Sequence, residues 1–225
     1  MTDDAIRLAK RVAELKACSR REAELYIEGG YVLVDDVVVE DQGARVATGQ
    51  TVTLADDATL LDIVPVTLLL NKPAGVDALS CLTAENRSAQ AGKERFLKRH
   101  VTKLQAMLPL HDAASGLFVF TQDFRVARKL VDEAAKIEQE LIADITGTIA
   151  EDGLKRLNNG WAKVSWQNEG RLRFAIKNVK PGQIERMCAD VGLTVTALKR
   201  LRIGRISMGA LPVGQWRYLQ GYERF

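Results

Sequence analysis

The sequence has few cysteines: Cys18, Cys81 and Cys188 are the only three in 225 residues, and no two of them form a CxxC pair. A disulfide framework requires an even, closely spaced set of cysteines, and a structural zinc site requires paired ligands. The spacing therefore excludes both as the organising feature of the chain. The same scarcity favours a reduced, cytoplasmic setting.

Long hydrophobic runs are also lacking. The first sixteen residues carry charges throughout, which argues against the apolar segment of a secretory signal peptide. The longest apolar runs are far too short to cross a bilayer. With 47% hydrophobic and 27% charged residues, the chain has the composition of an ordinary globular protein, and we expect no membrane partner.

Excess charge of one sign is small overall, because 32 Lys and Arg face 29 Asp and Glu. The distribution is more informative than the total. From Arg171 to Phe225 the chain has 11 Lys or Arg against 3 acidic residues. A basic half favours an anionic partner, most often nucleic acid, although it also fits a solvated basic surface.

The N-terminal part has the pattern of two short helices followed by small strands. Ile6–Ala17 places its apolar side chains on one stripe, and Ser19–Glu22 reads S-R-R-E, a capping box that begins a second helix. Gly29–Gly30 ends that helix, and short strands are expected over residues 31–39 and 51–54. Basic side chains lie on and between the helices: Arg7, Lys10, Arg11, Lys16, Arg20 and Arg21.

This part of the chain resembles the α-L RNA-binding module, a small domain found in a ribosomal protein, tyrosyl-tRNA synthetase and several RNA-modifying enzymes. The matching motifs are RLxK at residues 7–10 and CSRREAxxxIxxGxVxV at residues 18–34. Arg20 and Arg21 lie in the first turn of a helix, where unpaired N–H groups suit RNA phosphates rather than bases. A helical hairpin with a solvated charged face is the alternative. The residues expected to bind RNA here are Arg7, Lys10, Arg11, Arg20 and Arg21.

A linker over residues 58–66 is expected to separate this domain from a second one over residues 67–225. The second domain opens with the buried strand Thr67–Leu70 and the motif LLLNKPAGV. Lys72 in this motif is expected to hold a turn or to bind an RNA phosphate. The basic stretch Cys81–Met107 follows, which favours a segment that grips a nucleic-acid backbone, or a solvated loop.

The most informative stretch is Ala106–Asp123, in which a polar turn leads into a short apolar run typical of a buried strand. Its sequence HDAASGLFVFTQD resembles the signature RLDxDxxGLLxLTND of pseudouridine synthases of the RsuA/RluF type. In that signature the Asp of RLD is the catalytic carboxylate. Alignment without gaps on Gly116, Leu117 and Thr121 places His111 at the catalytic position.

Two further segments resemble the same family near its catalytic site. Residues 137–145 resemble the KEYxV strand, whose Tyr stacks on the target base, and Leu141 occupies the Tyr position. The segment PGQIERM resembles the helix start N-R-Q-I-R-R-M, whose first Arg lies beside the catalytic Asp. Gly182 occupies that position, and Arg186 is retained as a candidate RNA-binding residue.

The closing segment VTALKRLRIGRISM resembles the family motif LxRxRIGxxxL. Arg200 and Arg202 are two residues apart, which predicts that they share one face of a strand. The resemblance implies that both contact RNA or the acidic part of the site. Leu201 is expected to point the other way, into the core.

The resemblance implies a defined chemistry. Converting uridine to pseudouridine requires a carboxylate as nucleophile or base, a ring that stacks on the flipped base, and a cation that keeps the carboxylate ionised. Neither a metal nor an organic cofactor is required. This chain has His111, Leu141 and Gly182 at the three positions, which predicts an impaired site. Asp112 would serve as the carboxylate if the loop were one residue shorter than in the family.

These patterns together predict an α+β protein. Residues 1–57 form a small α-L RNA-binding domain, and the pseudouridine-synthase-like domain has a mixed, mainly antiparallel sheet flanked by helices. The favoured function is binding of structured rRNA or tRNA by a monomer with a disabled site. The alternative is a working pseudouridine synthase that uses Asp112, with Arg186 or Arg202 as the cation. A weaker alternative is a ribosome-associated scaffold that recognises protein.

Overall fold

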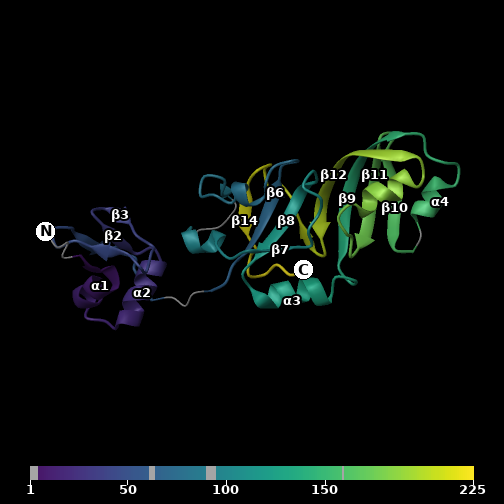
Figure 1. The fold of residues 1–225 in the computed structure, drawn as a ribbon. Coiled ribbons are helices and arrows are strands. Elements are labelled where there is room, and N and C mark those ends of the chain that lie inside the picture. Colours follow the sequence, from purple (N-terminus) through teal and green to yellow (C-terminus); the bar gives the residue numbers. More distant parts are fainter. Residues whose placement is uncertain (1–4, 61–63, 90–94, 159) are drawn as a thin grey trace. The chain divides into compact units, whose positions relative to one another are not determined.

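The computed structural model describes residues 5–60, 64–89, 95–158 and 160–225, which form two compact units (Figure 1). The first unit comprises Met1–Val64 with Arg95–Thr102, and the second comprises Pro65–Glu94 with Lys103–Phe225. Residues 61–63 of the predicted linker and 90–94 of the predicted basic stretch lie outside the described residues.

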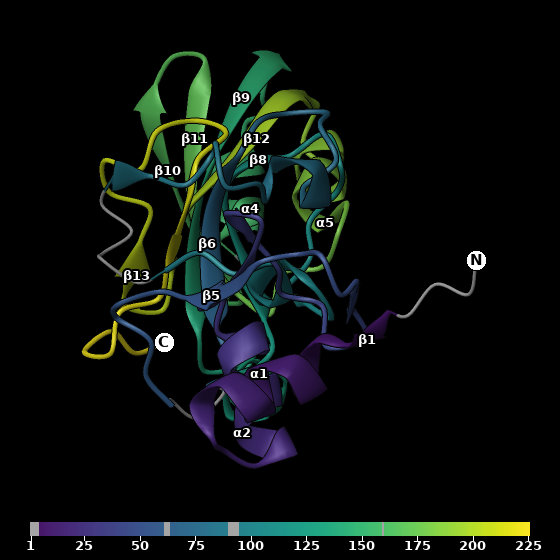
Figure 2. The ribbon, with the colours of Figure 1, turned by 90° about the vertical axis from the view of Figure 1, so that its left-hand side faces the viewer.

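The first unit is built on two packed helices, which Figure 2 brings toward the viewer: α1 (Leu8–Lys16) and α2 (Arg20–Glu28). Its strands are short. A three-stranded sheet has the order β3 (Val37–Val38), β2 (Val32–Val34), β5 (Val52–Leu54), and β1 (Ile6–Arg7) pairs with β4 (Arg45–Val46). The apolar stripe of α1 packs against α2 and these strands, so the core includes Leu8, Val12, Ala23, Ile27 and Val32.

The helix signals of the first unit act locally. The Ser19 hydroxyl accepts a hydrogen bond from the Glu22 amide at 3.2 Å, and the Glu22 carboxylate accepts one from the Ser19 amide at 2.7 Å, which confirms the predicted capping box. The first helix begins at Leu8 rather than at Ile6, because Ile6 and Arg7 pair with β4 in an antiparallel ladder.

The segment Arg95–Thr102 belongs to the first unit although it is distant in sequence. The Arg95 guanidinium donates to both carboxylate oxygens of Asp57, at 2.9 and 2.8 Å, and lies 4.6 Å from the centre of the Tyr31 ring. Leu97 is buried, and a 3-10 turn, η3 (Lys98–Val101), follows. The prediction that this segment belongs to the second domain is therefore corrected.

The second unit contains a nine-stranded sheet with the order β10-β11-β9-β12-β8-β6-β14, while β7 pairs with β8 and β13 pairs with β12. The pair β8–β12 is parallel, and the other named strand pairs are antiparallel. The strands are β6 (Thr67–Lys72), β7 (Gln105–Met107), β8 (Ser115–Thr121), β9 (Glu138–Gly147), β10 (Ala162–Asn168), β11 (Arg171–Lys177), β12 (Leu193–Ile203), β13 (Ile206–Ser207) and β14 (Trp216–Tyr218).

Among the described residues, three α-helices accompany this sheet: α3 (Phe124–Asp132), α4 (Gly153–Leu157) and α5 (Gln183–Ala189). α3 contacts β7 and β8, α4 contacts β10, and α5 contacts β12; a further 3-10 turn is η1 (Leu79–Cys81). The predicted buried strands are β6 and the apolar part of β8. None of the helices in the described part of the chain has the length and apolar character needed to cross a bilayer.

Candidate active site and nucleic-acid interface

The loop between β7 and β8 carries the residues that the sequence analysis placed at the catalytic position. His111 and Asp112 are both exposed, and the Ala114 amide donates to the His111 carbonyl at 2.9 Å, which closes a tight turn. The chain then enters β8, most of which is buried. The predicted polar turn that leads into a buried strand is therefore confirmed.

Lys72 supports this loop from below. Its side chain is buried, and its ammonium donates to the carbonyl oxygens of Asp112 at 2.7 Å, Ala114 at 3.0 Å and Pro73 at 3.0 Å. Burial lowers the pKa of Lys72, and the nearby charge of Asp112 opposes that shift. Of the two roles expected for Lys72, the structure gives it the turn-holding one. Its expected contact with an RNA phosphate is corrected, because its donors are committed to the backbone.

Arg200 supports the same loop from β12. Its guanidinium donates to the Leu117 carbonyl at 2.7 Å, the Leu108 carbonyl at 2.7 Å and the Gln139 side-chain oxygen at 2.9 Å. Arg200 is completely buried, and this burial lowers its pKa to about 9. The expectation that Arg200 binds RNA is corrected, because its side chain is completely buried and its guanidinium donates to groups inside the protein.

A β-bulge separates Arg200 from Arg202. Arg200 is paired with Leu141 of β9, whereas Arg202 is paired with Glu140, the adjacent residue. Adjacent residues of a strand point to opposite faces, so the two arginines do not share a face as predicted. Leu201, at the bulge, is half-buried and is not a core residue, which corrects the expectation for it as well.

Arg202 is engaged by acidic side chains on its own face. It lies 2.7 Å from a Glu138 carboxylate oxygen and 3.2 Å from one of Glu140, and Glu140 also contacts Arg173 at 2.9 Å. The hydrogen bond from Arg173, with a further one from Arg202, holds the pKa of Glu140 below its usual value of 4.5. The positive charge of Arg202 is therefore largely balanced within the protein.

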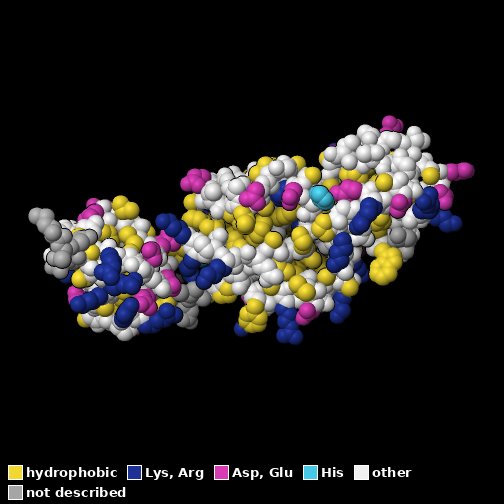
Figure 3. Space-filling model, viewed as in Figure 1, with side chains coloured by type: hydrophobic (Ala, Val, Ile, Leu, Met, Phe, Trp, Pro, Cys, Tyr) yellow, Lys and Arg dark blue, Asp and Glu magenta, His cyan; other side chains and the backbone are white. Residues whose placement is uncertain are grey.

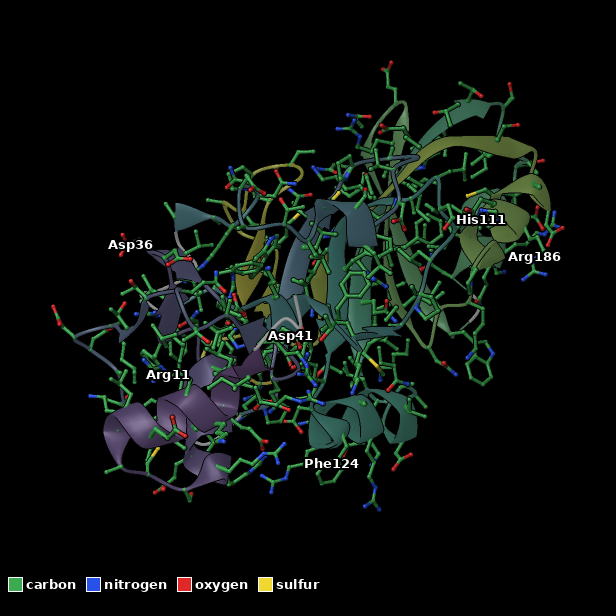
Figure 4. The ribbon with its side chains drawn as sticks, turned by 60° about the vertical axis from the view of Figure 1, so that its left-hand side comes forward. Arg11, Asp36, Asp41, His111, Phe124 and Arg186 are labelled. Carbon is green, nitrogen blue, oxygen red and sulfur yellow. The ribbon has the colours of Figure 1, made fainter. Side chains whose placement is uncertain are left out.

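The structure brings two of the three expected site positions together. Gly182 precedes α5 with φ of +73°, and a Cβ built on it would lie 4.0 Å from Cδ2 of His111. Figure 4 shows His111 beside α5, the helix that also carries the exposed Arg186. Leu141 is completely buried in β9, directly across from Arg200. The position opposite His111 therefore offers neither a charge nor a hydrogen-bond donor from a side chain.

The three cysteines are all free thiols. Cys188 is buried in α5, and burial, with the nearby charge of Glu185, raises its pKa to about 11. A thiol with this pKa is protonated at neutral pH and is a weak nucleophile. Within residues 5–60, 64–89, 95–158 and 160–225, no group of three or more His, Cys, Asp or Glu side chains is placed to hold a metal ion.

The basic residues of the first unit lie on its surface, where Figure 3 shows Lys and Arg side chains gathered over the helices. Arg20 contacts Glu24 at 3.2 Å in an exposed i,i+4 pair, a geometry that contributes little stability and leaves the guanidinium accessible. Arg7 donates to the Gly43 carbonyl at 3.3 Å. The five that were expected to bind RNA are all exposed: Arg7, Lys10, Arg11, Arg20 and Arg21.

Sequence reasoning missed two structural roles of basic residues. Arg95 and Arg87 both lie in the stretch expected to grip nucleic acid, but Arg95 binds Asp57 and Arg87 lies 5.3 Å from the centre of the Tyr218 ring. Their partners are distant in sequence, so no local signal identifies them. Gln139, which the resemblance aligns with the Lys of the KEYxV motif, is the side-chain partner of Arg200.

Comparison with known proteins identifies both parts of the chain. Residues 6–52 match the S4 domain family. The chain is 30% identical over 97% of its length to a protein of Mycobacterium tuberculosis called an uncharacterized RNA pseudouridine synthase, and it covers 91% of that protein. The chain belongs to the RNA pseudouridine synthase family.

Other pseudouridine synthases agree with this assignment. The dual-specificity RNA pseudouridine synthase RluF of Escherichia coli K12 is 27% identical over 99% of this chain and 78% of that protein. A crystal structure of a pseudouridylate synthase has the same fold, with a TM-score of 0.57, 19% identity and 96% of each chain covered. The predicted arrangement, an N-terminal RNA-binding domain of the S4 type followed by a pseudouridine synthase fold, is confirmed.

Proposed function

We propose that this member of the family binds structured rRNA or tRNA and no longer isomerises uridine. The observation that supports the proposal is the pairing of His111 with Gly182, in which the position beside the loop carries no side chain at all. The family chemistry requires a carboxylate with a cation beside it. An imidazole facing a glycine supplies neither partner.

The surrounding side chains favour the same reading. Lys72 and Arg200 are the buried cations beneath the loop, and both donate to backbone carbonyl oxygens. Leu141 covers an apolar face but has no ring to stack on a base and no hydroxyl. The fold of the site is retained while the reacting groups are replaced.

The binding part of the proposal rests on the exposed basic residues of the first unit. Lys and Arg on an accessible helical surface bind phosphates without reading sequence. Arg20 and Arg21 lie in the first turn of α2, where the backbone N–H groups add to their positive charge. We further propose that the protein is a monomer and that it binds rRNA or tRNA in the cytoplasm.

Asp112 provides the competing function. It is exposed on the loop next to His111, and its backbone oxygen accepts hydrogen bonds from the Lys72 ammonium at 2.7 Å and the Gly75 amide at 3.2 Å. The loop is thus held firmly enough to present a carboxylate. If Asp112 is the catalytic group, the chain is a working pseudouridine synthase.

A pseudouridine assay separates the two functions. Bulk rRNA and tRNA are incubated with the wild-type chain or with Asp112→Ala, and pseudouridine is quantified by mass spectrometry after digestion to nucleosides. We expect no pseudouridine above the level in untreated RNA. Pseudouridine that forms with the wild type and not with Asp112→Ala would show that the chain is an enzyme.

RNA binding is measured on the same RNA by fluorescence anisotropy over a salt series. We expect affinity to fall steeply as salt rises, and Arg20→Ala/Arg21→Ala to weaken binding about equally for different RNAs. The matched control is Arg128→Ala/Lys136→Ala, which removes two exposed cations from the second unit. A flat salt response, or equal effects of the two variants, would contradict binding through the first unit.

A further inference from the structure

The strands β10, β11, β9 and β12 have two faces with different properties. Val164, Phe174, Leu141 and Arg200 form one register row across the four strands, and all of them are buried. Because side chains alternate along a strand, the adjacent rows point to the opposite side of the sheet. We call that side the outer face.

The outer face is accessible and charged. One of its rows consists of Ser165, Arg173, Ile142 and Lys199, of which Ser165 and Arg173 are exposed and the other two half-buried. The register places the following residues on this face: Glu138, Glu140, Ile142, Asp144, Lys163, Ser165, Arg171, Arg173, Lys177, Lys199 and Arg202.

The acidic side chains of the outer face are all paired with arginine. Arg202 contacts Glu138 and Glu140, and Arg171 contacts Asp144. The three lysines of this face take part in none of the ion pairs found among the described residues: Lys163, Lys177 and Lys199. The face therefore has a net positive charge, which attracts an anionic partner.

A pocket of about 400 Å³ opens on the outer face. Ile142 and Leu201 give it apolar lining, while Ser165, Gln167 and Arg173 supply a hydroxyl, an amide and a guanidinium. The volume lies within the usual range for small-ligand pockets, about 300 to 1,000 Å³. Apolar surface combined with polar groups suits a planar heterocycle that carries hydrogen-bonding atoms on its edge.

From this arrangement we propose that the outer face binds a single-stranded segment of RNA, with one nucleobase in the pocket and phosphates of the nucleotides on either side of it at Lys163 and Lys199. The proposal rests on the proposed RNA-binding function and adds a second RNA contact, separate from the S4 domain and from the face of Leu141. Lys163 and Lys199 lie on β10 and β12, three strand spacings apart, or roughly 15 Å.

A single strand suits the pocket better than a duplex does. Bases in a duplex are stacked and paired, whereas an unpaired base is free to enter a pocket and expose its edge to side chains. Arg173 is oriented by Glu140 at 2.9 Å, so the guanidinium is positioned before RNA arrives.

Two variants of the full chain test the proposal by different routes. Lys163→Glu/Lys199→Glu reverses the charge at the two lysine positions. Ser165→Trp places a large side chain in the pocket at a position that is exposed to solvent. The matched control is Lys136→Glu/Lys155→Glu, which makes the same change in net charge at exposed positions outside the four strands. Probes are a fluorescein-labelled 12-nucleotide single-stranded RNA and an RNA hairpin, measured by anisotropy over a salt series.

We expect Lys163→Glu/Lys199→Glu to bind the single strand at least about 10-fold more weakly than the control variant, with a shallower salt dependence because phosphate contacts are lost. Ser165→Trp is expected to weaken binding of the single strand with an unchanged salt slope. Arg20→Glu/Arg21→Glu is expected to weaken binding of the hairpin more than binding of the single strand. Circular dichroism during thermal unfolding verifies folding of each variant, because tryptophan fluorescence would report only the second unit, which holds all three tryptophans.

The outcomes separate this proposal from the one on which it rests. If the wild type binds neither RNA, the proposed function fails and the outer-face site fails with it. If the wild type binds RNA while both outer-face variants match the control on the single strand, the outer face is a solvated sheet surface, and RNA binding by the S4 domain stands.

Discussion

Gly116 is the residue at which the fold of the candidate site is most sensitive to a single methyl group. It begins the buried part of β8 with φ of +90° and pairs with Arg200 in the parallel ladder to β12. A Cβ built on Gly116 would lie 2.9 Å from the Arg200 amide nitrogen, 3.0 Å from its carbonyl carbon and closer still to its carbonyl oxygen. These atoms are backbone in a central strand, so they cannot move aside cheaply.

Gly116→Ala should therefore destabilise the second unit through two additive effects. A non-glycine residue in the left-handed region costs about 1–2 kcal/mol, and overpacking of a rigid interior costs about 1–3 kcal/mol. The expected loss in free energy of unfolding is about 2–5 kcal/mol, which corresponds to a fall of about 5–15 °C in Tm for a unit of this size. The displaced strand also carries the carbonyl of Leu117 to which Arg200 donates.

Gly75→Ala is the matched control. Gly75 also has a positive φ, +68°, but nothing lies within 4 Å of a Cβ built there. It should lose only the backbone cost of about 1 kcal/mol. Urea unfolding followed by tryptophan fluorescence reports the second unit selectively, because Trp161, Trp166 and Trp216 all belong to it. Equal losses in the two variants would refute the argument from close backbone approach.

Three further changes test separate parts of the structure. Ser19→Ala removes the hydroxyl that accepts from the Glu22 amide and should cost the first unit about 1 kcal/mol, measured by circular dichroism during thermal unfolding. Lys72→Met should cost the second unit about 2–3 kcal/mol in urea unfolding, because three carbonyl oxygens lose a charged donor; a stability equal to wild type would contradict its supporting role. The pKa of Glu140 is lowered in the folded state mainly by Arg173, so its contribution to stability is present above pH 4.5 and is lost as pH falls through the folded value. Glu140→Gln should therefore show a weaker loss of stability between pH 5 and pH 3 than the wild type, and identical acid profiles would contradict the ion pair.

Local sequence signals were sufficient wherever the structure depends on neighbours in the chain. The capping box at Ser19, the stop at Gly29–Gly30 and the apolar stripe of α1 all concern contacts within about one helical turn. The apolar run 117–120 was long enough and sufficiently β-prone to identify the buried part of β8. Ordered motifs then identified the family, because they place similar residues at similar spacings over most of the chain.

The errors arose where a side chain has partners that are distant in sequence. Strand alternation predicted that Arg200 and Arg202 share a face, but the bulge at Leu201 reverses the alternation, and only the register with β9 reveals it. Basic character suggested RNA contacts for Lys72 and Arg200. Both side chains are buried, and most of the groups to which they donate are distant in sequence.

The sequence by itself determined the two helices of the first unit, the strand after the loop and the family, because these follow from residue types and short spacings. Only the tertiary structure decided that Gly182 faces His111, that Arg95–Thr102 joins the first unit and that the outer face is open. These features depend on which strands pair and in which register. Pairing is set by the burial of the whole sheet, a property that no local pattern contains.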